Sequence, residues 1–408
     1  MKKRNIHITL ALFVISSLSV KLLIIFKYGN LLTLSSDDLN YIKSGIVLLE
    51  RGILTYQNYT EPTVFITPGY PLFLAAWFGL AGHDFFGIQV VRFIQALISC
   101  MGIVIVFLIA KELVDEKVAL ISAFLISFYM PNITTPGYIM TETLFTTLLL
   151  ALVYFSLIFS AKPKSGKFII LGVLWAITTL CRPTIALYPG LLFFYILLHF
   201  KMRFRNLIKF GAIMFVSFAM IMLPWWVRNY HEYGEFIPLA ASSGNPMLQG
   251  SYIDYQQTPE NTVYYQLGRN AFETNKVEMQ AAKMRIKIEW KRDFWAYLKW
   301  YTIGKTKILW NGIFYWKEFL GVTQHIVLSY HYVLLLGFAS MLSLLVQRFT
   351  KYTLIVSVIL YFNAIHCAYM TFDRYAFPVM PLISIFCAVF LVKLFEILRS
   401  TKFSFVYG

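Results

Sequence analysis

Long stretches without a charged side chain constrain this sequence more than any other feature. A membrane-spanning helix needs about 20 mostly apolar residues. Eight stretches approach or exceed this length without any Asp, Glu, Lys or Arg: residues 93–110, 118–141, 143–161, 183–200, 210–227, 319–347, 352–372 and 375–392. We therefore expect most of the chain to lie in a membrane.

Two further stretches bring the expected number of spans to about ten. Residues 8–26 contain a single charge, Lys21, near one end of the stretch, where its long side chain can reach the lipid headgroups. Residues 168–181 are apolar but short. Because backbone groups inside lipid must be hydrogen-bonded within their own segment, each span is predicted to be a helix. The expected fold class is an all-α polytopic membrane protein.

The composition agrees with this prediction and excludes other classes. Hydrophobic residues make up 58% of the 408 residues and charged residues only 14%, whereas soluble domains carry about 25% charged residues. The remaining polar surface is too small to cover the core of a soluble multidomain enzyme. The net charge is +16, but the basic residues are not concentrated in one soluble segment, so we expect no nucleic-acid partner.

Lysine and arginine residues in short connections mark the cytoplasmic side of the membrane. They are Lys2, Lys3, Arg4, Lys162, Lys164, Lys167, Lys201, Arg203, Arg205, Arg348, Lys351, Arg399 and Lys402. All lie on one side, facing anionic lipids, if both termini are cytoplasmic. We expect an integral protein of a bacterial plasma membrane, forming a single domain over residues 1–408 with long outer loops at 27–84 and 228–316.

The clearest polar cluster lies in the first outer loop. Residues 35–41 read Ser-Ser-Asp-Asp-Leu-Asn-Tyr, and residues 42–51 are predicted to form a short amphipathic helix that a glycine ends. Helix capping accounts for one acid, since Ser and Asp are favoured at helix starts. It does not account for a second acid, or for Tyr41 one turn after Asp37. Asp37 and Asp38 are therefore candidate catalytic residues, with Tyr41 beside them.

Single charges at the outer ends of later spans form a second group of candidates. Glu142 interrupts an otherwise uncharged run, and a lone carboxylate at membrane depth requires a partner or water. Arg182, Arg228 and Arg374 lie at the same face in the expected topology. Anchoring at the interface, or for Arg374 a local pair with Asp373, accounts for each arginine alone. Their convergence with the acids favours a phosphate ligand, because arginine binds phosphate in a bidentate way and stays charged.

Weaker signals complete the candidate substrate cavity. Residues 67–72, Thr-Pro-Gly-Tyr-Pro-Leu, are typical of a rigid turn that opens a second short helix. A small polar loop in the second outer loop can contact a sugar or phosphate through backbone N–H groups, and residues 277–299 have helical spacing. The candidates in these segments and after Arg228 are Tyr70, Asn229, Tyr230, Ser243 and Gly244. No histidine spacing, Gly-x-Ser-x-Gly motif or Walker-type loop indicates a metal or nucleotide site.

Together these segments resemble the membrane glycosyltransferases of the GT-C fold, in particular glycosyltransferase family 39, with its protein O-mannosyltransferases and aminoarabinose transferases. Residues 37–41 resemble the family's Asp-Glu-x-x-Tyr opening of the first outer loop, and residues 67–72 resemble its Pro-rich turn. Later family segments are matched, in the same order, by residues 141–145, 182–184, 224–230 and 374–381. The resemblance covers nearly the whole chain and implies a GT-C fold with short amphipathic helices in the outer loops.

The resemblance implies an inverting enzyme that moves a hexosyl or pentosyl unit from a polyprenyl phosphate to an acceptor at the outer face. The acceptor would be a protein, a lipid or a glycan. In the family the first acid of the loop is the general base, a role that falls on Asp37 with Asp38 beside it. The related aminoarabinose enzymes have a lysine where this chain has Thr67, so one of the three arginines would hold the donor phosphate instead.

The chemistry of such a donor limits what the protein must supply. A polyprenyl phosphate is a good leaving group, so the reaction requires a base and cations but no general acid. Some GT-C relatives use a divalent cation, and Asp37 with Asp38 could bind one. Such cations prefer several oxygen ligands, so we expect that no metal or other cofactor is required.

Two other functions remain open from the sequence. A secondary transporter or lipid flippase would place ionisable residues near the bilayer midplane, often in repeated halves, and no internal repeat occurs here. A polysaccharide polymerase or ligase would use a diphosphate-linked glycan and would also keep its loops outside. The sequence does not separate that function from use of a monophosphate-linked donor.

Overall fold

The computed structural model describes residues 3–404, with side chains described for residues 5–399. Lys2 and the side chains of Lys3, Arg4 and Lys402, used above to orient the chain, lie outside this part. Within the described residues every regular element is a helix or helical turn. Short 3-10 turns connect the helices at Gly29–Leu31, Thr135–Gly137, Pro183–Ile185, Ile253–Tyr255 and Asp373–Val379.

Apolar helices form the body of the molecule, as the uncharged stretches predict. Seven helices of the described chain are long and apolar enough to cross a membrane, or eight if a bent pair counts as one span. The spans contain α1 (Lys3–Tyr28), α4 (Phe85–Leu113), α7 (Thr141–Ala161), α9 (Tyr188–Phe200) together with the 3-10 turn before it, α10 (Phe204–Tyr233), α15 (Gln324–Leu335) with α16 (Gly337–Ala368), and α17 (Met380–Ser404). The bent pair is α5 (Glu116–Ser127) with α6 (Met130–Thr134), at 65°. The chain is therefore an integral membrane protein with the expected all-α fold.

The number of spans is lower than the expected ten or so for local reasons. The short stretch at 168–181 lies in α8 (Ser165–Cys181), whose 17 residues fall at the lower limit of a full crossing. The stretches at 319–347 and 352–372 are counted as one run of 45 residues, but two helices meet within it at Arg348, whose φ of −145° and ψ of 50° are not helical. The stretch at 118–141 bends where a proline begins α6.

The two long loops carry short helices. The first loop contains α2 (Asp37–Arg51) and α3 (Gly69–Ala81). Gly52 ends α2 in the left-handed region at φ 68°, as the sequence predicts. The second loop contains α11 (Gly244–Gly250), α12 (Ala271–Arg292), α13 (Phe294–Lys299), a π-helical turn (Trp300–Gly304) and α14 (Lys305–Asn311). The helix predicted at 277–299 is split, because Asp293 caps α13 by accepting a hydrogen bond from the Ala296 N–H at 3.0 Å.

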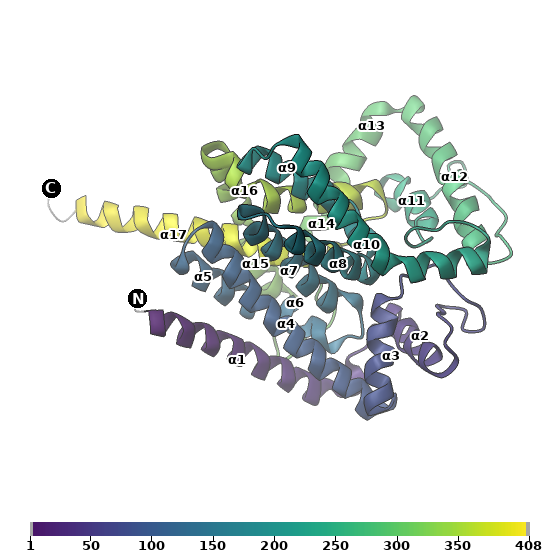
Figure 1. Cartoon of the computed structure of the whole chain (residues 1–408), viewed down its shortest axis with the longest axis horizontal. Helices are drawn as coiled ribbons and strands as arrows, with labels where there is room; N and C mark the ends of the chain where they lie inside the picture. The colour runs from purple at the N-terminus through teal and green to yellow at the C-terminus, as the bar shows by residue number, and fades with distance from the viewer. Residues whose placement is uncertain (1–2, 405–408) are drawn as a thin grey trace.

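Figure 1 shows how these elements divide along the long axis of the molecule. Both termini lie at the left end of the view, and the helices of the two long loops lie at the right end: α2, α3, α11, α12 and α13. The apolar helices fill the region between them. The loops therefore gather at the end opposite the termini, which is the arrangement that the charge pattern predicts.

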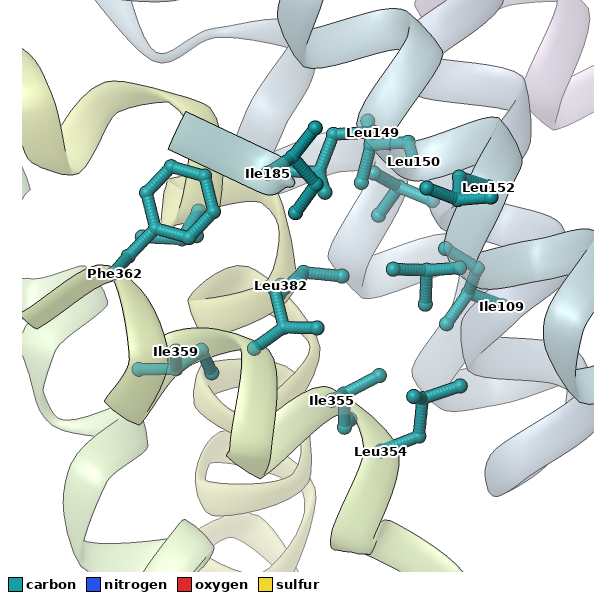
Figure 2. Close-up of a cluster of buried hydrophobic side chains, with 14 of the residues drawn as sticks. Ile109, Leu149, Leu150, Leu152, Ile185, Leu354, Ile355, Ile359, Phe362 and Leu382 are labelled. Atoms are coloured by element: carbon teal, nitrogen blue, oxygen red, sulfur yellow. The ribbon is translucent and has the colours of Figure 1, made fainter. Parts of the chain in front are cut away.

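A hydrophobic core joins helices that are distant in the sequence. Figure 2 shows side chains of α4, α7, α16 and α17 in one cluster, among them Ile109, Leu150, Ile355 and Leu382. These four side chains are buried, with at most 1% of their surface exposed. The core fixes α7, α16 and α17 relative to one another, and the segments at their outer ends carry the charged residues described below.

One charge inside the first span departs from the prediction. Lys21 of α1 is fully buried and does not reach toward the headgroups. Its Nζ donates to Ser17 Oγ at 2.6 Å, and Ser17 Oγ in turn donates to the Ser127 carbonyl at 2.9 Å. Because α4 and α5 pack against α1 on this face, protein covers the side chain.

Candidate active site

The start of α2 holds its two acids in different environments. Asp38 is buried, and its carboxylate accepts hydrogen bonds from Thr33 Oγ1 at 2.6 Å, Leu34 N at 2.9 Å and Ser36 N at 3.0 Å. These bonds close the turn that leads into the helix, because they satisfy backbone N–H groups just before the helix start. Asp38 therefore fixes the loop, while Asp37 has other partners.

Asp37 forms an ion pair with the last outer connection of the chain. Arg374 Nη2 lies 2.9 Å from Asp37 Oδ2, and the Tyr56 hydroxyl donates to Asp37 Oδ1 at 3.0 Å. The side chains of Asp37 and Arg374 are 32% and 18% exposed, so a ligand can reach both. The local pair of Arg374 with Asp373, considered above, does not involve the guanidinium. Instead the backbone N–H of Arg374 donates to Asp373 Oδ1 at 2.7 Å.

A second ion pair joins the start of α7 to the end of α8. Arg182 Nη1 lies 3.3 Å from Glu142 Oε1, with 16% and 1% of the two side chains exposed. The Thr141 hydroxyl adds a longer hydrogen bond of 3.4 Å to Glu142 Oε2. Glu142 thus has the partner that a buried carboxylate requires.

One aromatic ring links the two ion pairs. The Tyr375 ring centroid lies 5.4 Å from the guanidinium carbon of Arg374 and 5.7 Å from that of Arg182. Guanidinium groups are attracted to aromatic rings at such distances. The His366 ring stacks on Tyr375 with centroids 4.5 Å apart. Two carboxylates and two arginines, from four separate elements, therefore lie together around Tyr375.

Tyrosine side chains of the first outer loop pack beside these ion pairs. Tyr41 lies edge-to-face against Tyr70 at 5.1 Å and 5.3 Å from Tyr56, measured between ring centroids. Burial raises the pKa of Tyr41, with a smaller lowering by Arg182 and a further rise caused by Asp37. Burial also raises the pKa of Tyr56, and the neighbouring Tyr41 and Asp37 add to this rise. Both hydroxyls therefore stay protonated, and that of Tyr56 donates to Asp37.

Tyr70 and three candidates on α10 take other roles in the structure. The Tyr70 hydroxyl donates to Gln95 Oε1 at 2.8 Å, so its ring, not its hydroxyl, faces Tyr41. Arg228 donates to the Thr63 carbonyl at 2.8 Å and to Asn229 Oδ1 at 3.0 Å. Asn229 Nδ2 donates to the Ile237 carbonyl at 3.0 Å, and Tyr230 is 63% exposed. These hydrogen bonds join α10 to neighbouring loops and do not involve Asp37 or Glu142.

Ser243 and Gly244 lie at the start of α11, inside the second outer loop. The Gly244 N–H donates to Asn275 Oδ1 of α12 at 2.7 Å. A Cβ at Gly244 would lie 2.4 Å from the Asn275 carbonyl oxygen, so the two helices touch at this glycine. The backbone donor expected to meet a ligand is thus used in packing α11 against α12.

Three residues contact or support the site but are not among the candidates chosen from the sequence: Tyr56, Tyr375 and Lys305. Tyr56 lies in an irregular part of the first loop and carries no sequence signal. Tyr375 directly follows Arg374 and lies in residues 374–381, which resemble a family segment, so its neighbourhood gave a signal. Lys305 is one of three lysines in residues 299–307, and its burial depends on a fold that the local sequence does not show.

The cations at this site are guanidinium groups. Among the described residues no group of three or more His, Cys, Asp or Glu side chains is placed to hold a metal ion. Asp37 and Asp38 have no hydrogen-bond partner in common. Arg182 and Arg374 lie beside the two carboxylates, where an anionic ligand would find two donors of bidentate geometry.

Comparisons with known proteins agree with this architecture. The family model for dolichyl-phosphate-mannose-protein mannosyltransferases matches residues 66–226. A structure of the Archaeoglobus fulgidus oligosaccharyltransferase with zinc and sulfate aligns with 96% of the chain at 15% identity and a TM-score of 0.58. The chain has the GT-C fold. Another structure of this oligosaccharyltransferase, with an inhibitory peptide and a dolichol-phosphate, aligns with 96% of the chain at 12% identity and a TM-score of 0.55.

The resemblance to the GT-C enzymes drawn from the sequence motifs is thus confirmed. The chain spans about half of each oligosaccharyltransferase chain, 49% and 52%. ArnT from Cupriavidus metallidurans bound to undecaprenyl phosphate aligns with 92% of this GT-C chain and 77% of its own, at 14% identity and a TM-score of 0.46. A search of the curated proteins found no match. At such identities the likeness establishes the fold, and the substrate must be argued from the site.

Proposed function

We propose that this chain is an inverting glycosyltransferase that moves a monosaccharide from a polyprenyl-phosphate donor to an acceptor at the outer face of a plasma membrane. The observation that carries the proposal is the 2.9 Å contact of Asp37 with Arg374, beside the pair of Glu142 and Arg182. A candidate base thus lies next to two cations suited to phosphate. The oligosaccharyltransferase structure that contains a dolichol-phosphate supports a lipid-linked donor.

In this proposal Asp37 takes the proton of the acceptor nucleophile. The nucleophile forms a bond to the anomeric carbon as the bond from that carbon to the phosphate oxygen breaks, which inverts the configuration. The electron pair leaves with the polyprenyl phosphate, whose added negative charge Arg374 and Arg182 stabilise. The phosphate leaves without protonation, so the site needs no general acid and the guanidinium groups need no divalent cation beside them.

The observed ion pair also supports an order of events. In the resting protein Arg374 is bound to Asp37. The phosphodiester of the donor carries a single negative charge, as the carboxylate does. Its two free oxygens can bind the guanidinium in a bidentate way, whereas Asp37 contacts Arg374 through Nη2 alone, so the donor competes with the carboxylate for the guanidinium. Once Arg374 binds the phosphate, Asp37 retains the Tyr56 hydroxyl and becomes available to the acceptor. Asp38 holds the turn throughout, so we assign it a positioning role.

The remaining candidates fall into two groups in this proposal. Tyr41, Tyr70 and Glu142 border the site and shape the cavity for the sugar. Residues that hydrogen-bond within the outer loops support those loops and do not bind the donor phosphate; these are Arg228, Asn229, Ser243 and Gly244. The acceptor, whether a protein, a lipid or a glycan, approaches from the side of the outer loops.

The deciding experiment measures release of undecaprenyl phosphate from undecaprenyl-phosphate-linked sugars by the purified full-length protein in nanodiscs, with a membrane extract as acceptor source. We expect Asp37→Asn to lower the rate about 100- to 10,000-fold, because it removes the base. Asp254→Asn is the matched control, since Asp254 is exposed and its φ of 50° suits asparagine. Excess EDTA should leave the wild-type rate unchanged.

The same purified protein, in nanodiscs or in proteoliposomes, separates the alternatives. Diphosphate-linked donors run in parallel would be preferred by a polymerase or ligase. Uptake of sugar or lipid into proteoliposomes without any transfer would favour a transporter or flippase. Transfer by Asp37→Asn at the wild-type rate would contradict the proposed base.

A further inference from the structure

The connection that carries Arg374 is short, and its middle residue is covered. Residues 369–374, which we call the strap, run from the end of α16 to the guanidinium that pairs with Asp37. Thr371, in the middle of the strap, is fully buried. Its hydroxyl donates to the His366 carbonyl at 2.8 Å, which turns the strap back onto the end of α16. Most other contacts of the strap come from the second outer loop.

Two segments of the second outer loop hydrogen-bond the strap backbone. The Met370 N–H donates to the Pro246 carbonyl at 2.8 Å. The Tyr255 hydroxyl accepts from the Thr371 N–H at 2.7 Å and donates to the Thr371 carbonyl at 3.0 Å. Both polar backbone groups of Thr371 thus depend on one side chain 116 residues away. Burial raises the pKa of Tyr255, so its hydroxyl remains a donor.

A buried lysine holds the beginning of the strap. Lys305 is fully buried, and its Nζ donates to the Cys367 carbonyl at 3.0 Å and the Tyr369 carbonyl at 2.8 Å. These carbonyls belong to the end of α16, where helix carbonyls lack partners within the helix. The same Nζ lies 3.7 Å from the centroid of the Tyr301 ring. The π-helical turn that precedes Lys305 is a feature often found at functional positions.

The protonation state of Lys305 does not change this arrangement. Burial lowers the pKa of Lys305 to about 7, with a small opposing rise caused by Cys367. A neutral amine still has two N–H donors, one for each carbonyl. The lysine therefore satisfies both carbonyls on either side of this pKa.

Close backbone packing leaves the strap little room. A Cβ at Gly250 would lie 2.6 Å from the carbonyl carbon of Tyr369. A Cβ at Gly312 would lie 2.6 Å from Asp373 Cβ. The second outer loop therefore touches both ends of the strap, and neither contact tolerates a side chain without a shift.

We propose that Tyr255 and Lys305 are positioning residues that hold the strap and thereby set the position of Arg374 against Asp37. The second outer loop then controls how well the donor phosphate binds without contacting it. The identity of the ligand rests on the proposed function, whereas the contacts that hold the strap do not.

The test compares the full-length protein in nanodiscs with Tyr255→Phe, Lys305→Met and Lys305→Arg. Tyr264→Phe and Lys307→Met are matched controls, since both side chains lie in the same loop and are exposed. Hydrogen–deuterium exchange at residues 369–376 reports on the strap. Binding of undecaprenyl phosphate reports on Arg374, with Arg374→Gln as the reference for loss.

Tyr255→Phe and Lys305→Met each remove two hydrogen bonds that hold the strap and the end of α16. We expect both variants to raise exchange in the strap and to weaken lipid binding about threefold to tenfold. Lys305→Arg keeps N–H donors, so it should restore part of the binding. The two controls should match the wild type. If Lys305→Met does not fold, Tyr255→Phe still tests the inference, because it removes only a hydroxyl.

Two results would overturn the inference. The first is unchanged exchange in the strap of both Tyr255→Phe and Lys305→Met. The second is raised exchange in these variants while they bind the lipid like the wild type and Arg374→Gln does not bind it. If Arg374→Gln itself binds the lipid like the wild type, the proposed function fails instead. Exchange at residues 35–41 then decides the inference, since it rises together with that of the strap only if the strap holds Arg374 against Asp37.

Discussion

Glu142 and Arg182 depend on each other more than an exposed pair would, because both side chains are largely removed from water. Glu142→Gln leaves the Arg182 charge buried without a partner, so we expect a loss of about 3 kcal/mol in the free energy of unfolding. In the double variant Glu142→Gln/Arg182→Met no charge remains unpaired. Its loss should therefore be smaller than the sum of the two single losses. Unfolding in detergent, followed by intrinsic fluorescence, measures the loss for Glu142→Gln, for Arg182→Met and for the double variant.

The control for these variants is Glu235→Gln, which breaks the ion pair between Glu235 and Lys276. The two side chains of this pair are 53% and 44% exposed. Exposed pairs contribute less than about 1 kcal/mol. Equal losses of unfolding free energy in Glu142→Gln and Glu235→Gln would show that water screens the pair of Glu142 and Arg182, contrary to its burial.

Lys305 makes the stability of the protein depend on pH in a predictable direction. The pKa of Lys305 is about 7 in the folded chain, because burial lowers it from the usual value of 10.5. Between these values the unfolded chain binds more protons, so the stability contributed by this residue rises with pH from 7 to about 10. It is lost again as pH falls toward 7.

The measurement is the difference in unfolding free energy between wild type and Lys305→Met at pH 7, 8 and 9, which cancels other titrating groups. The difference should change in favour of the wild type by at most about 1.4 kcal/mol per pH unit. A difference that is flat over this range would mean that Lys305 stays charged in the folded protein, stabilised by the carbonyls and the ring around it.

At the level of single residues the sequence predicts the candidates better than their partners. The Asp-Asp-x-x-Tyr motif and Glu142 identify two of the acids that the structure brings together. The choice of Arg374 and not Arg228 as the partner of Asp37 depends on helix packing across 337 residues. The separate role of Asp38 depends on the turn at Thr33. No local sequence pattern indicates either the partner of Asp37 or the role of Asp38.

The start of α3 and the end of α8 meet at a glycine, which links two elements of the site. A Cβ at Gly69 would lie 2.5 Å from the Leu180 carbonyl oxygen, two residues before Arg182. Gly69→Ala therefore separates the two elements, and we expect a loss of about 1–3 kcal/mol in stability together with slower sugar transfer. Unfolding temperature and transfer rate, measured on the same preparation, test this.

The matched control is Gly79→Ala on the same helix, where the added methyl meets only the flexible Leu49 Cδ1 at 3.3 Å. Gly79→Ala should behave like the wild type. Wild-type behaviour of Gly69→Ala as well would show that α3 can shift without moving Arg182.

At the level of elements, hydropathy predicts where helices lie but not how they are divided. Uncharged stretches correspond to helices because lipid requires internal backbone hydrogen bonding. The bend between α5 and α6 lies just before Pro131. The proline can be seen in the sequence, but it does not specify the angle of the bend. Arg348 is predicted to lie at a connection between two spans, and two helices do meet at this residue, but the connection is a kink of one residue, which charge composition does not predict.

For the whole molecule, the position of both termini opposite the long loops predicts the sidedness of labelling. We expect a cysteine at Tyr264 in the second outer loop to react with a membrane-impermeant maleimide on intact cells. A cysteine at Lys164, in a basic connection, should react only after the membrane is opened. Both wild-type side chains are exposed, and the four native cysteines are buried.

The unsubstituted protein gives the background, and labelling after lysis confirms that both sites are reactive. Labelling of Lys164→Cys, but not Tyr264→Cys, on intact cells would invert the proposed orientation. Equal labelling of both would mean that the two segments share a side, against the proposed topology.

The pair of Asp37 and Arg374 has a consequence for how the protein is made. Its members are 337 residues apart, and at about 5–20 residues per second the ribosome needs roughly 20–70 s to reach the second after the first. The turn around Asp38 is local and can form at once. In the proposed topology, an unfinished chain in the membrane therefore already presents its acid to the outside but has no arginine beside it. The proposed function then predicts that lipid-linked sugar in the same membrane meets a competent enzyme only after the connection that carries Arg374 has been inserted.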